Sequence, residues 1–159
     1  MDKTIYHMTI PSPLGELSCA ATAPGVILVM YTPYILPAGA CTTGKPNELL
    51  ERLRDQLDEY FAGTRRRFDV PVLLSGTPHR LKVWDALCGV PYGKTVTYRH
   101  IAETVGSAPI AVGQAVGQNR VNILVPCHRV VGSDGSLTGY GGGLERKRFL
   151  LELEAGVAR

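Results

Sequence analysis

Short runs of alternating apolar and polar residues fill the first third of the chain. Thr4–Ile10 and Glu16–Ala21 have strand character, and the turn sequence Ser12-Pro13-Leu14-Gly15 separates them. Val26–Tyr31 is a third apolar run, and Phe68–Leu74 is a fourth strand candidate. The pattern predicts a small sheet of short strands.

The spacing of apolar residues changes from two to between three and four after Asn47. In ELLERLRDQLDEYFAG, leucine and aromatic residues recur at helical spacing, Asn47 is a good N-cap, and Gly63 ends the run. A second helix, HRLKVWDALCGV, is predicted with Thr77 as its N-cap and Pro78 at its first position. Cys88 lies among the apolar residues of this helix, so we interpret it as a core thiol.

Two shorter helices are predicted after the break at Pro91-Tyr92-Gly93. Thr97 caps YRHIAETVG, and IAVGQAVGQN follows the tight turn 106–109. Two short helices joined by such a turn form the helix-turn-helix pattern. VNILV then has strand character, and LERKRFLLELE closes the chain as a helix. We therefore expect an α/β N-terminal domain over residues 1–74 and a mostly α C-terminal domain over residues 75–159.

The second helix of the pair repeats a four-residue pattern, AVGQAVGQ. Ala111 and Ala115 share one face, and Gly113 and Gly117 share another. Each glycine inside a helix costs roughly 1 kcal/mol relative to alanine. Two explanations remain open: close packing in a small core, or the approach of an external backbone or groove wall.

Composition indicates a folded chain. Of the 159 residues, 45% are hydrophobic and 19% are charged, which favours a packed core over disorder. Residues 80–159 carry 10 Lys and Arg against 6 Asp and Glu, a balance of +4, whereas residues 1–79 carry 7 against 8. The second half is the better candidate to meet a polyanion, although an ordinary solvated surface explains the charge equally well.

The chain also has features that indicate its compartment. It has no apolar run long enough to span a bilayer, and MDKTIYHMTI lacks the layout of a signal peptide. We therefore predict a cytoplasmic protein with no membrane partner. Its four cysteines, which form no C-x-x-C pair, are expected to be free thiols: Cys19, Cys41, Cys88 and Cys127.

The candidate chemistry centres on VPCHRV, residues 125–130. Cys127 is followed by His128, and an imidazole beside a thiol can help to form the reactive thiolate. Neighbours in an extended segment point to opposite sides, so a water relay or a turn at Pro126 would be needed. The other histidines and cysteines fall at no recurring ligand spacing, which argues against a metal. Taken alone, the dipeptide is a weak signal, and a buried structural cysteine is the better explanation of it.

The wider pattern resembles a known family. PCHRVVGSDGSLTGYGGGLERKRFLLELE resembles the active-site segment of the O6-alkylguanine-DNA alkyltransferases, also called methylated-DNA–protein-cysteine methyltransferases. GTPHRLKVWDALCGVPYGKTVTYRHIAETVG is similar to the DNA-binding half of that family, and SPLGELS and DEYFAG resemble its N-terminal half more loosely. The resemblance covers nearly the whole chain.

The resemblance implies both fold and function. It implies a small antiparallel, ribonuclease-H-like sheet with a helix, followed by a winged-helix-like helix-turn-helix domain. The activity it implies is DNA repair by direct reversal. An alkyl group moves irreversibly, in a single turnover, from O6-alkylguanine (more weakly O4-alkylthymine) in double-stranded DNA to a cysteine. No cofactor is implied, a monomer is expected, and the protein would associate with the nucleoid when bound to DNA.

The resemblance also implies roles for individual residues. Cys127 is the alkyl acceptor, His128 activates it through an ordered water, and Glu154 completes that network. Asn119 braces the active-site turn, and Tyr98 donates to the departing guanine. The guanine is expected to lie against Val130, Tyr140, Gly141 and Lys147. The DNA is expected to contact Tyr98, Ile110, Ala111, Gly113, Ala115, Gly117, Arg120 and Arg129.

Two positions depart from the family's pattern. Ile110 stands where the family usually has the arginine that fills the space left by the flipped base. Isoleucine can act as an apolar wedge between base steps, but it offers no charge or hydrogen bond. Arg120 stands where proline commonly follows the asparagine, and it can return a phosphate contact. We predict that DNA affinity is reduced more than thiol reactivity.

Other readings follow from the same residues. A cysteine hydrolase built on Cys127, His128 and Glu154 would turn over many times. A non-catalytic module would bind alkylated DNA without reacting. An alkyltransferase with weakened DNA contacts would act mainly on small O6-benzylguanine-type compounds. Some family members carry a structural zinc, but the matching positions cannot ligate it, so we predict no metal: Ile5, Thr22, Ile27 and the region near Leu74.

Overall fold

The structure is a computed structural model, and it describes residues 4–34 and 43–156. Cys41, which we predicted to be a free thiol, lies outside these residues. The chain divides into two compact units, Met1–Leu74 and Ser75–Arg159.

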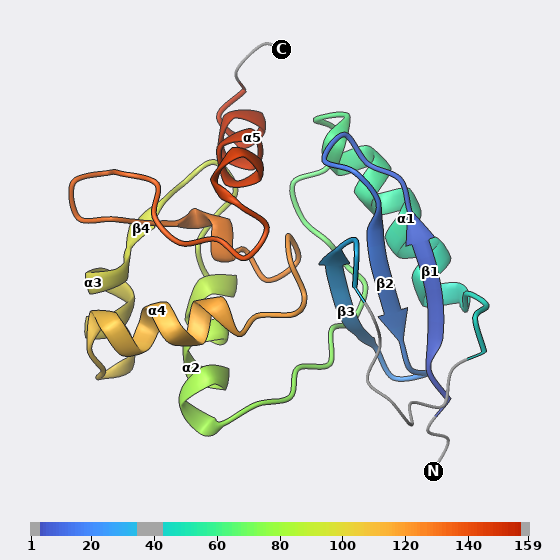
Figure 1. The fold of residues 1–159 in the computed structure, drawn as a ribbon, viewed down its shortest axis with the longest axis horizontal. Coiled ribbons are helices and arrows are strands. Elements are labelled where there is room, and N and C mark those ends of the chain that lie inside the picture. Colours follow the sequence, from blue (N-terminus) through green and yellow to red (C-terminus); the bar gives the residue numbers. More distant parts are fainter. Residues whose placement is uncertain (1–3, 35–42, 157–159) are drawn as a thin grey trace. The chain divides into compact units, whose positions relative to one another are not determined.

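The N-terminal unit contains an antiparallel sheet with the strand order β1-β2-β3 (Figure 1). Its strands are β1 (Tyr6–Ile10), β2 (Leu17–Ala21) and β3 (Val26–Tyr31). The predicted turn joins the first two, with the Gly15 amide donating to the Ser12 carbonyl at 3.0 Å. All five residues of the central strand are buried. Three of the four predicted strands are therefore confirmed.

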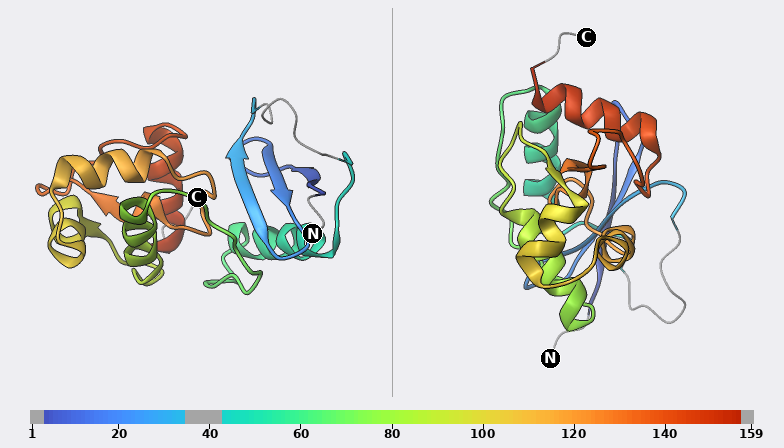
Figure 2. Two further views of the ribbon diagram at one scale, coloured as in Figure 1. Left: turned by 90° about the horizontal axis from the view of Figure 1, so that it is seen from below. Right: turned by 90° about the vertical axis from the view of Figure 1, so that its left-hand side faces the viewer.

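The predicted first helix is α1 (Glu48–Phe61), which lies along one face of the sheet (Figure 2, left). The Asn47 side chain accepts a hydrogen bond from the Leu50 amide at 3.0 Å, which confirms the predicted N-cap. Leu50, Leu53 and Leu57 recur at helical spacing and are at most 1% exposed. They anchor α1 on the sheet.

The fourth predicted strand, Phe68–Leu74, is wrong. The segment forms only an isolated parallel bridge between Val72 and Val26. Its two hydrogen bonds there are Val26 N to Pro71 O, at 2.9 Å, and Leu73 N to Val26 O, at 2.8 Å. Pro71 has no amide hydrogen to extend the ladder, so an apolar run does not become a strand.

The C-terminal unit is mostly helical, as predicted. Its elements are α2 (Pro78–Cys88), β4 (Val96–Thr97), α3 (Tyr98–Val105), α4 (Pro109–Gly117), a 3-10 helix η1 (Cys127–Arg129), β5 (Val130–Val131) and α5 (Leu144–Glu154). Thr77 and Thr97 cap α2 and α3 as predicted. α2, α3 and α4 pack against one another, and Trp84 of α2 donates its indole N–H to the Ala115 carbonyl of α4 at 2.9 Å.

Two predictions in this unit are wrong. Cys88 is exposed, because it ends α2 beyond the buried stripe of Val83, Trp84 and Leu87. VNILV is a turn instead of a strand: Ile123 has a φ of 73°, and the Leu124 amide donates to the Asn122 carbonyl at 2.8 Å. An apolar sequence gave strand character to a segment that the backbone folds back on itself.

Residues 4–34 and 43–156 contain neither a membrane-spanning helix nor a metal-binding cluster. No helix there is long and apolar enough to cross a bilayer. No group of three or more His, Cys, Asp or Glu side chains there is placed to hold a metal ion.

Candidate active site

A turn after Pro126 places Cys127 and His128 in the interior. The Cys127 amide donates to the Val125 carbonyl at 2.8 Å, and the Arg129 amide donates to the Pro126 carbonyl at 3.0 Å. Residues 127–129 thus form a single 3-10 turn, and all three side chains are buried. Neighbouring side chains point to opposite sides only in an extended segment, so this turn allows Cys127 and His128 to be buried together.

The sulfur of Cys127 is enclosed. The residue is 3% exposed, and the Asn119 side-chain amide donates to its Sγ at 3.2 Å. Burial raises the pKa of the Cys127 thiol to about 11, although the Asn119 hydrogen bond and the charge of Lys147 partly oppose that rise. At neutral pH the group is therefore a thiol, and it must lose its proton to a base as it reacts.

His128 is suited to be that base. It is fully buried, and its Nε2 lies 2.7 Å from Oε2 of Glu154. An ionised carboxylate only accepts, so Nε2 carries the hydrogen and Nδ1 presents a lone pair. Burial lowers the pKa of His128, although Glu154 opposes that effect. The lowered pKa keeps the ring neutral. Nδ1 has no hydrogen-bond partner within the described part of the chain.

Arg129 makes two hydrogen bonds to the Glu154 carboxylate. Its Nε donates to Oε1 of Glu154 at 2.7 Å, and a terminal nitrogen donates to Oε2 at 3.0 Å. The other terminal nitrogen donates to the Val90 carbonyl at 2.7 Å. Arg129 is only 8% exposed. Our assignment of Arg129 to DNA contact is therefore corrected: its guanidinium points inward and orients the acid behind His128.

Asn119 connects the turn to the sulfur. Its Nδ2 donates to the Val125 carbonyl at 3.1 Å as well as to the sulfur, and its Oδ1 accepts from the Val121 amide at 2.9 Å. These bonds span Ile123, whose positive φ is strained for a β-branched residue. Sequence reasoning missed Asn122, whose Oδ1 lies 3.7 Å from the Cys127 sulfur. A second asparagine three residues on was the available clue.

Tyr98 and Lys147 converge on one carbonyl of the glycine-rich loop. The Tyr98 hydroxyl donates to Thr138 O at 2.8 Å, and Lys147 Nζ donates to the same oxygen at 2.7 Å. Lys147 is fully buried, and burial lowers its pKa to about 8. Its Nζ lies 5.8 Å from the centre of the Tyr98 ring. If the hydroxyl turns to another partner, Thr138 O keeps a hydrogen bond from the lysine.

The other residues that we expected to contact the guanine differ in how far they are exposed. Val130 is fully buried in β5, where it pairs with Val96 of β4. Tyr140 is half-buried, and Gly141 is exposed in the loop before α5.

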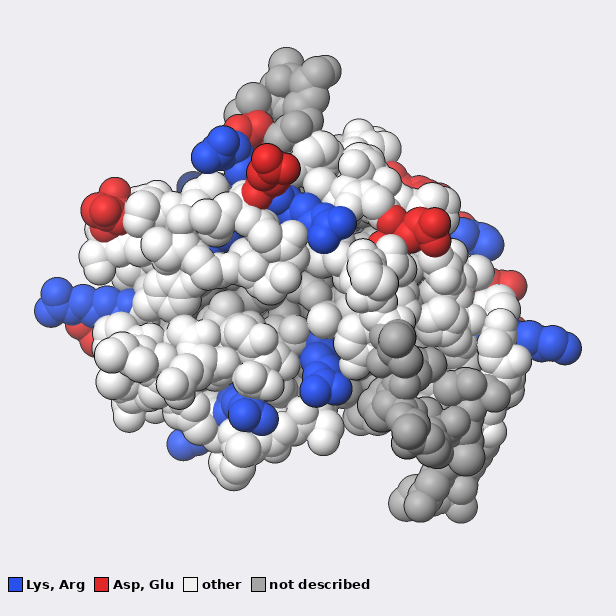
Figure 3. Space-filling model, in the orientation of Figure 1, with Lys and Arg blue, Asp and Glu red and all other residues white. Residues whose placement is uncertain are grey.

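The two glycines of α4 are not explained by close internal packing. A Cβ added to Gly117 would meet nothing within 4 Å, and one added to Gly113 would meet only the Tyr98 ring, at 4.0 Å. Ile110, at the start of the helix, is 79% exposed. The surface over α4 is mostly uncharged, with isolated Lys or Arg side chains (Figure 3). The small residues therefore leave room for something outside the protein.

The remaining residues expected to contact DNA differ in exposure. Ala111 is half-buried and Arg120 is exposed. Ala115 is 2% exposed and faces α2, so its assignment to a DNA-contacting face is corrected. A run of small residues has too little hydrophobic contrast to indicate which face packs inward.

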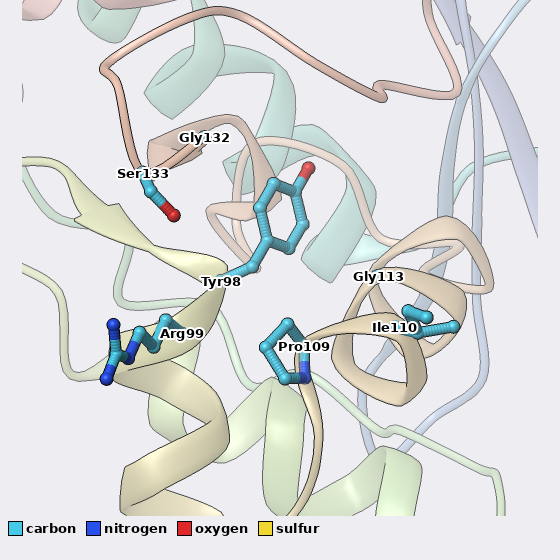
Figure 4. A pocket seen from close by; sticks show the side chains of 7 residues that line it. All are labelled: Tyr98, Arg99, Pro109, Ile110, Gly113, Gly132 and Ser133. Atoms are coloured by element: carbon cyan, nitrogen blue, oxygen red, sulfur yellow. The ribbon is translucent and has the colours of Figure 1, made fainter.

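A pocket of about 390 Å³ opens beside Tyr98 (Figure 4). Sequence reasoning named three of its lining residues, Tyr98, Ile110 and Gly113, and missed Arg99, Pro109, Gly132 and Ser133. Arg99 directly follows Tyr98 in the sequence, which was the only clue to its position.

Comparisons with known proteins agree with this geometry. Residues 5–74 match the family described as 6-O-methylguanine DNA methyltransferase, ribonuclease-like domain, and residues 78–156 match its DNA binding domain. The chain belongs to the 6-O-methylguanine DNA methyltransferase family, as the resemblance predicted.

Individual relatives cover nearly the whole chain. The methylated-DNA–protein-cysteine methyltransferase of Mycobacterium tuberculosis is 45% identical over an alignment of 155 residues that covers 94% of this chain and 92% of that protein. The enzyme of the same name from Methanosarcina barkeri is 40% identical over 94% and 97%. The crystal structure of Mycobacterium tuberculosis OGT in complex with DNA has a TM-score of 0.86 and 41% identity, and covers 98% of this chain and 94% of that one. The predicted fold class is confirmed.

Proposed function

We propose that this protein repairs O6-alkylguanine in double-stranded DNA by moving the alkyl group to Cys127, once and irreversibly. Membership of the family supports the reaction class. The observation that carries the assignment to this residue is the neutral, buried base that follows it in the turn: His128, which contacts the Glu154 carboxylate that Arg129 also binds. Such an arrangement is built to remove one proton inside the protein.

The Cys127 proton passes to Nδ1 of His128 through a bridging water, which suits a buried nitrogen that has no hydrogen-bond partner among residues 4–34 and 43–156. The sulfur attacks the alkyl carbon, an S–C bond forms, and the bond from that carbon to O6 breaks. The bonding electrons stay on the guanine, which takes up a proton. The thioether on Cys127 has no leaving group, so the protein is used once.

Tyr98 and Lys147 are placed to assist the leaving guanine. The Tyr98 hydroxyl donates to the guanine as negative charge develops, and the nearby Lys147 ammonium stabilises the phenolate or the thiolate. Lys147 also retains its bond to Thr138 O when the tyrosine turns away. Val130, Tyr140 and Gly141 would border the same base.

We propose that α4 lies against the DNA while the target nucleotide is extruded. Extrusion costs about a few kcal/mol, which the contacts along the groove must offset. Glycines with open space above them allow a groove wall to come close. A similar protein has been crystallised in complex with DNA, which supports DNA as the partner. We expect a monomer that works in the cytoplasm on nucleoid DNA.

The test is intact-mass analysis after incubation with duplex DNA that carries O6-methylguanine. We expect one added methyl group per protein molecule, restored guanine in the DNA, and no further reaction with fresh DNA. Cys127→Ser should gain no mass and should still bind the duplex. Repeated turnover with an unmodified protein would favour a cysteine hydrolase, and binding without any mass change would favour a non-catalytic module.

One observation favours a second version of this function. Ile110 is the exposed residue at the start of α4, and it brings no charge to the DNA. In this version DNA binding is weak and small O6-benzylguanine-type compounds are the better substrates. The ratio of transfer rates from an alkylated oligonucleotide and from free O6-benzylguanine separates the two versions.

A further inference from the structure

The residues that line the pocket beside Tyr98 include no member of the Cys127 turn. We propose that it binds one phosphodiester and deoxyribose of the damaged strand, next to the extruded nucleotide, with Arg99 as the phosphate ligand. This inference rests on the proposed function, since it assigns a place to the strand that delivers the base.

Arg99 is free to exchange its present partner for a phosphate. It pairs with Glu103 one helical turn away, at 3.3 Å, and the two side chains are 76% and 67% exposed. Ion pairs this exposed contribute little to stability. A phosphate oxygen offers the guanidinium a stronger, charge-assisted contact. Arg99 can therefore turn to the DNA at small cost to the fold.

The opposite walls fit the sugar. Arg99 and Ser133 lie on one side of the pocket and Ile110 of α4 on the other, with Tyr98 and Pro109 between them (Figure 4). Apolar carbons suit the deoxyribose, while the guanidinium and the Ser133 hydroxyl suit phosphate oxygens. One wall is thus polar and cationic, and the other is apolar.

The backbone adds to the positive character of this pocket. Tyr98 and Arg99 are the first two residues of α3, and Pro109 and Ile110 are the first two of α4, so two helix N-termini meet at one pocket. The N-terminal end of a helix favours anions. The N-cap of α4, Ala108, provides no side-chain cap. These features reinforce the charge of Arg99.

The location explains how a helix without an arginine at its start can hold DNA. Ile110 provides apolar surface, and the cationic residue among those that line the same pocket, Arg99, comes from α3. An arginine at position 110 would provide both contact surface and positive charge. Here the surface comes from α4 and the charge from α3. DNA binding should therefore depend on Arg99 more than on other exposed arginines of this unit.

The test compares Arg99→Gln with Glu103→Gln. Both remove the same surface ion pair, so an effect on the fold would be shared. We expect Arg99→Gln to weaken binding of an O6-methylguanine duplex by about tenfold and to reduce the slope of log K against log[salt] by about one. Glu103→Gln, which removes a repelling charge, should bind as tightly as the unchanged protein or tighter. Ser133→Ala should produce a smaller loss in the same direction.

The reaction with free O6-benzylguanine provides the second readout. Its rate should be the same in all three variants, because no phosphate is present. The proposal is overturned if Arg99→Gln binds DNA like Arg148→Gln, an exposed arginine on α5 outside the pocket, or if Glu103→Gln weakens binding equally. Failure of the proposed function would look different: Cys127 would gain no alkyl group in any variant.

Discussion

The acceptor site and the outer face of α4 are built in opposite ways. Around Cys127 the polar groups are buried and bonded to one another: His128, Glu154 and Arg129 form one chain of contacts no longer than 3.0 Å. Along α4 the exposed residues are Pro109, Ile110 and Gly117, together with the polar Gln114, and a Cβ added to Gly117 would meet nothing within 4 Å. Contacts within the protein hold the first region together, whereas we propose that the second contacts DNA.

This contrast predicts that reactivity and DNA binding can be changed separately. A buried hydrogen-bonded network is sensitive to the loss of any member, because the others remain unsatisfied. An exposed helix tolerates substitution in the free protein, and the effect appears only when DNA is bound.

His128→Ala should have the largest effect on reactivity. Removing a positioned base lowers the transfer rate by roughly 10²–10⁴-fold. The loss should be similar with methylated duplex and with free O6-benzylguanine, while the Kd for DNA stays the same. Single-turnover rates and a binding titration measure these quantities. A loss confined to the DNA substrate would place His128 in DNA recognition instead.

Arg129→Met should affect both stability and the pH profile. Leaving Glu154 buried without its partner should lower the free energy of unfolding by about 3–5 kcal/mol, as measured by denaturant titration. The positive charge of Arg129 helps to lower the pKa of His128. Without it the pKa rises, so the acid limb of the rate profile should move to higher pH. Arg129→Lys, which keeps a charge, should shift the limb less.

In the unchanged protein, too, the transfer rate should fall toward acid pH. The base must be neutral to act, and the pKa of His128 is below its ordinary value of 6.5. The transfer rate should therefore fall only when the pH drops below about 6.5. An acid limb centred well above that value, with Arg129 intact, would contradict the neutral-base account.

Ile110→Arg tests the exposed region. The new charge should tighten DNA binding by about tenfold and steepen the salt dependence by about one unit of slope. The rate with free O6-benzylguanine should not change. Tight binding by the unchanged protein, with no gain on substitution, would refute the idea that this position limits DNA affinity.

Gly113→Ala should have small and opposite effects on the stability of the free protein and on its affinity for DNA. Alanine is favoured in a helix interior by about 0.5–1 kcal/mol, and the added Cβ has room. The melting temperature should therefore rise, while affinity for DNA should fall because the groove wall is held away. Higher stability with unchanged DNA affinity would show that this face of α4 does not touch DNA.

The elements that sequence reasoning predicted correctly depend on local chemistry. Asn47, Thr77 and Thr97 each cap a helix through a bond to a residue three positions later, so the pattern contains the whole interaction. The strand predictions failed where a single residue overrode the apolar pattern. Pro71 lacks a donor, and Ile123 takes a positive φ.

The sequence predicted which residues form the site, but not the direction in which each side chain points. The resemblance identified the residues around Cys127, and the structure brings Asn119, His128 and Glu154 together with it or with one another. Arg129 was misassigned because its partner lies 25 residues away, and sequence adjacency does not reveal a tertiary contact.

The most direct test of the central claim is to locate the transferred methyl group. Cys88 is exposed, whereas Cys127 is buried. Accessibility alone would therefore favour reaction at Cys88, whereas activation by His128 favours Cys127. After incubation with an O6-methylguanine duplex, peptide mass mapping should find one methyl group, on Cys127, with Cys88 unmodified. Methyl groups on Cys88, or none on Cys127 after the guanine is restored, would contradict the account.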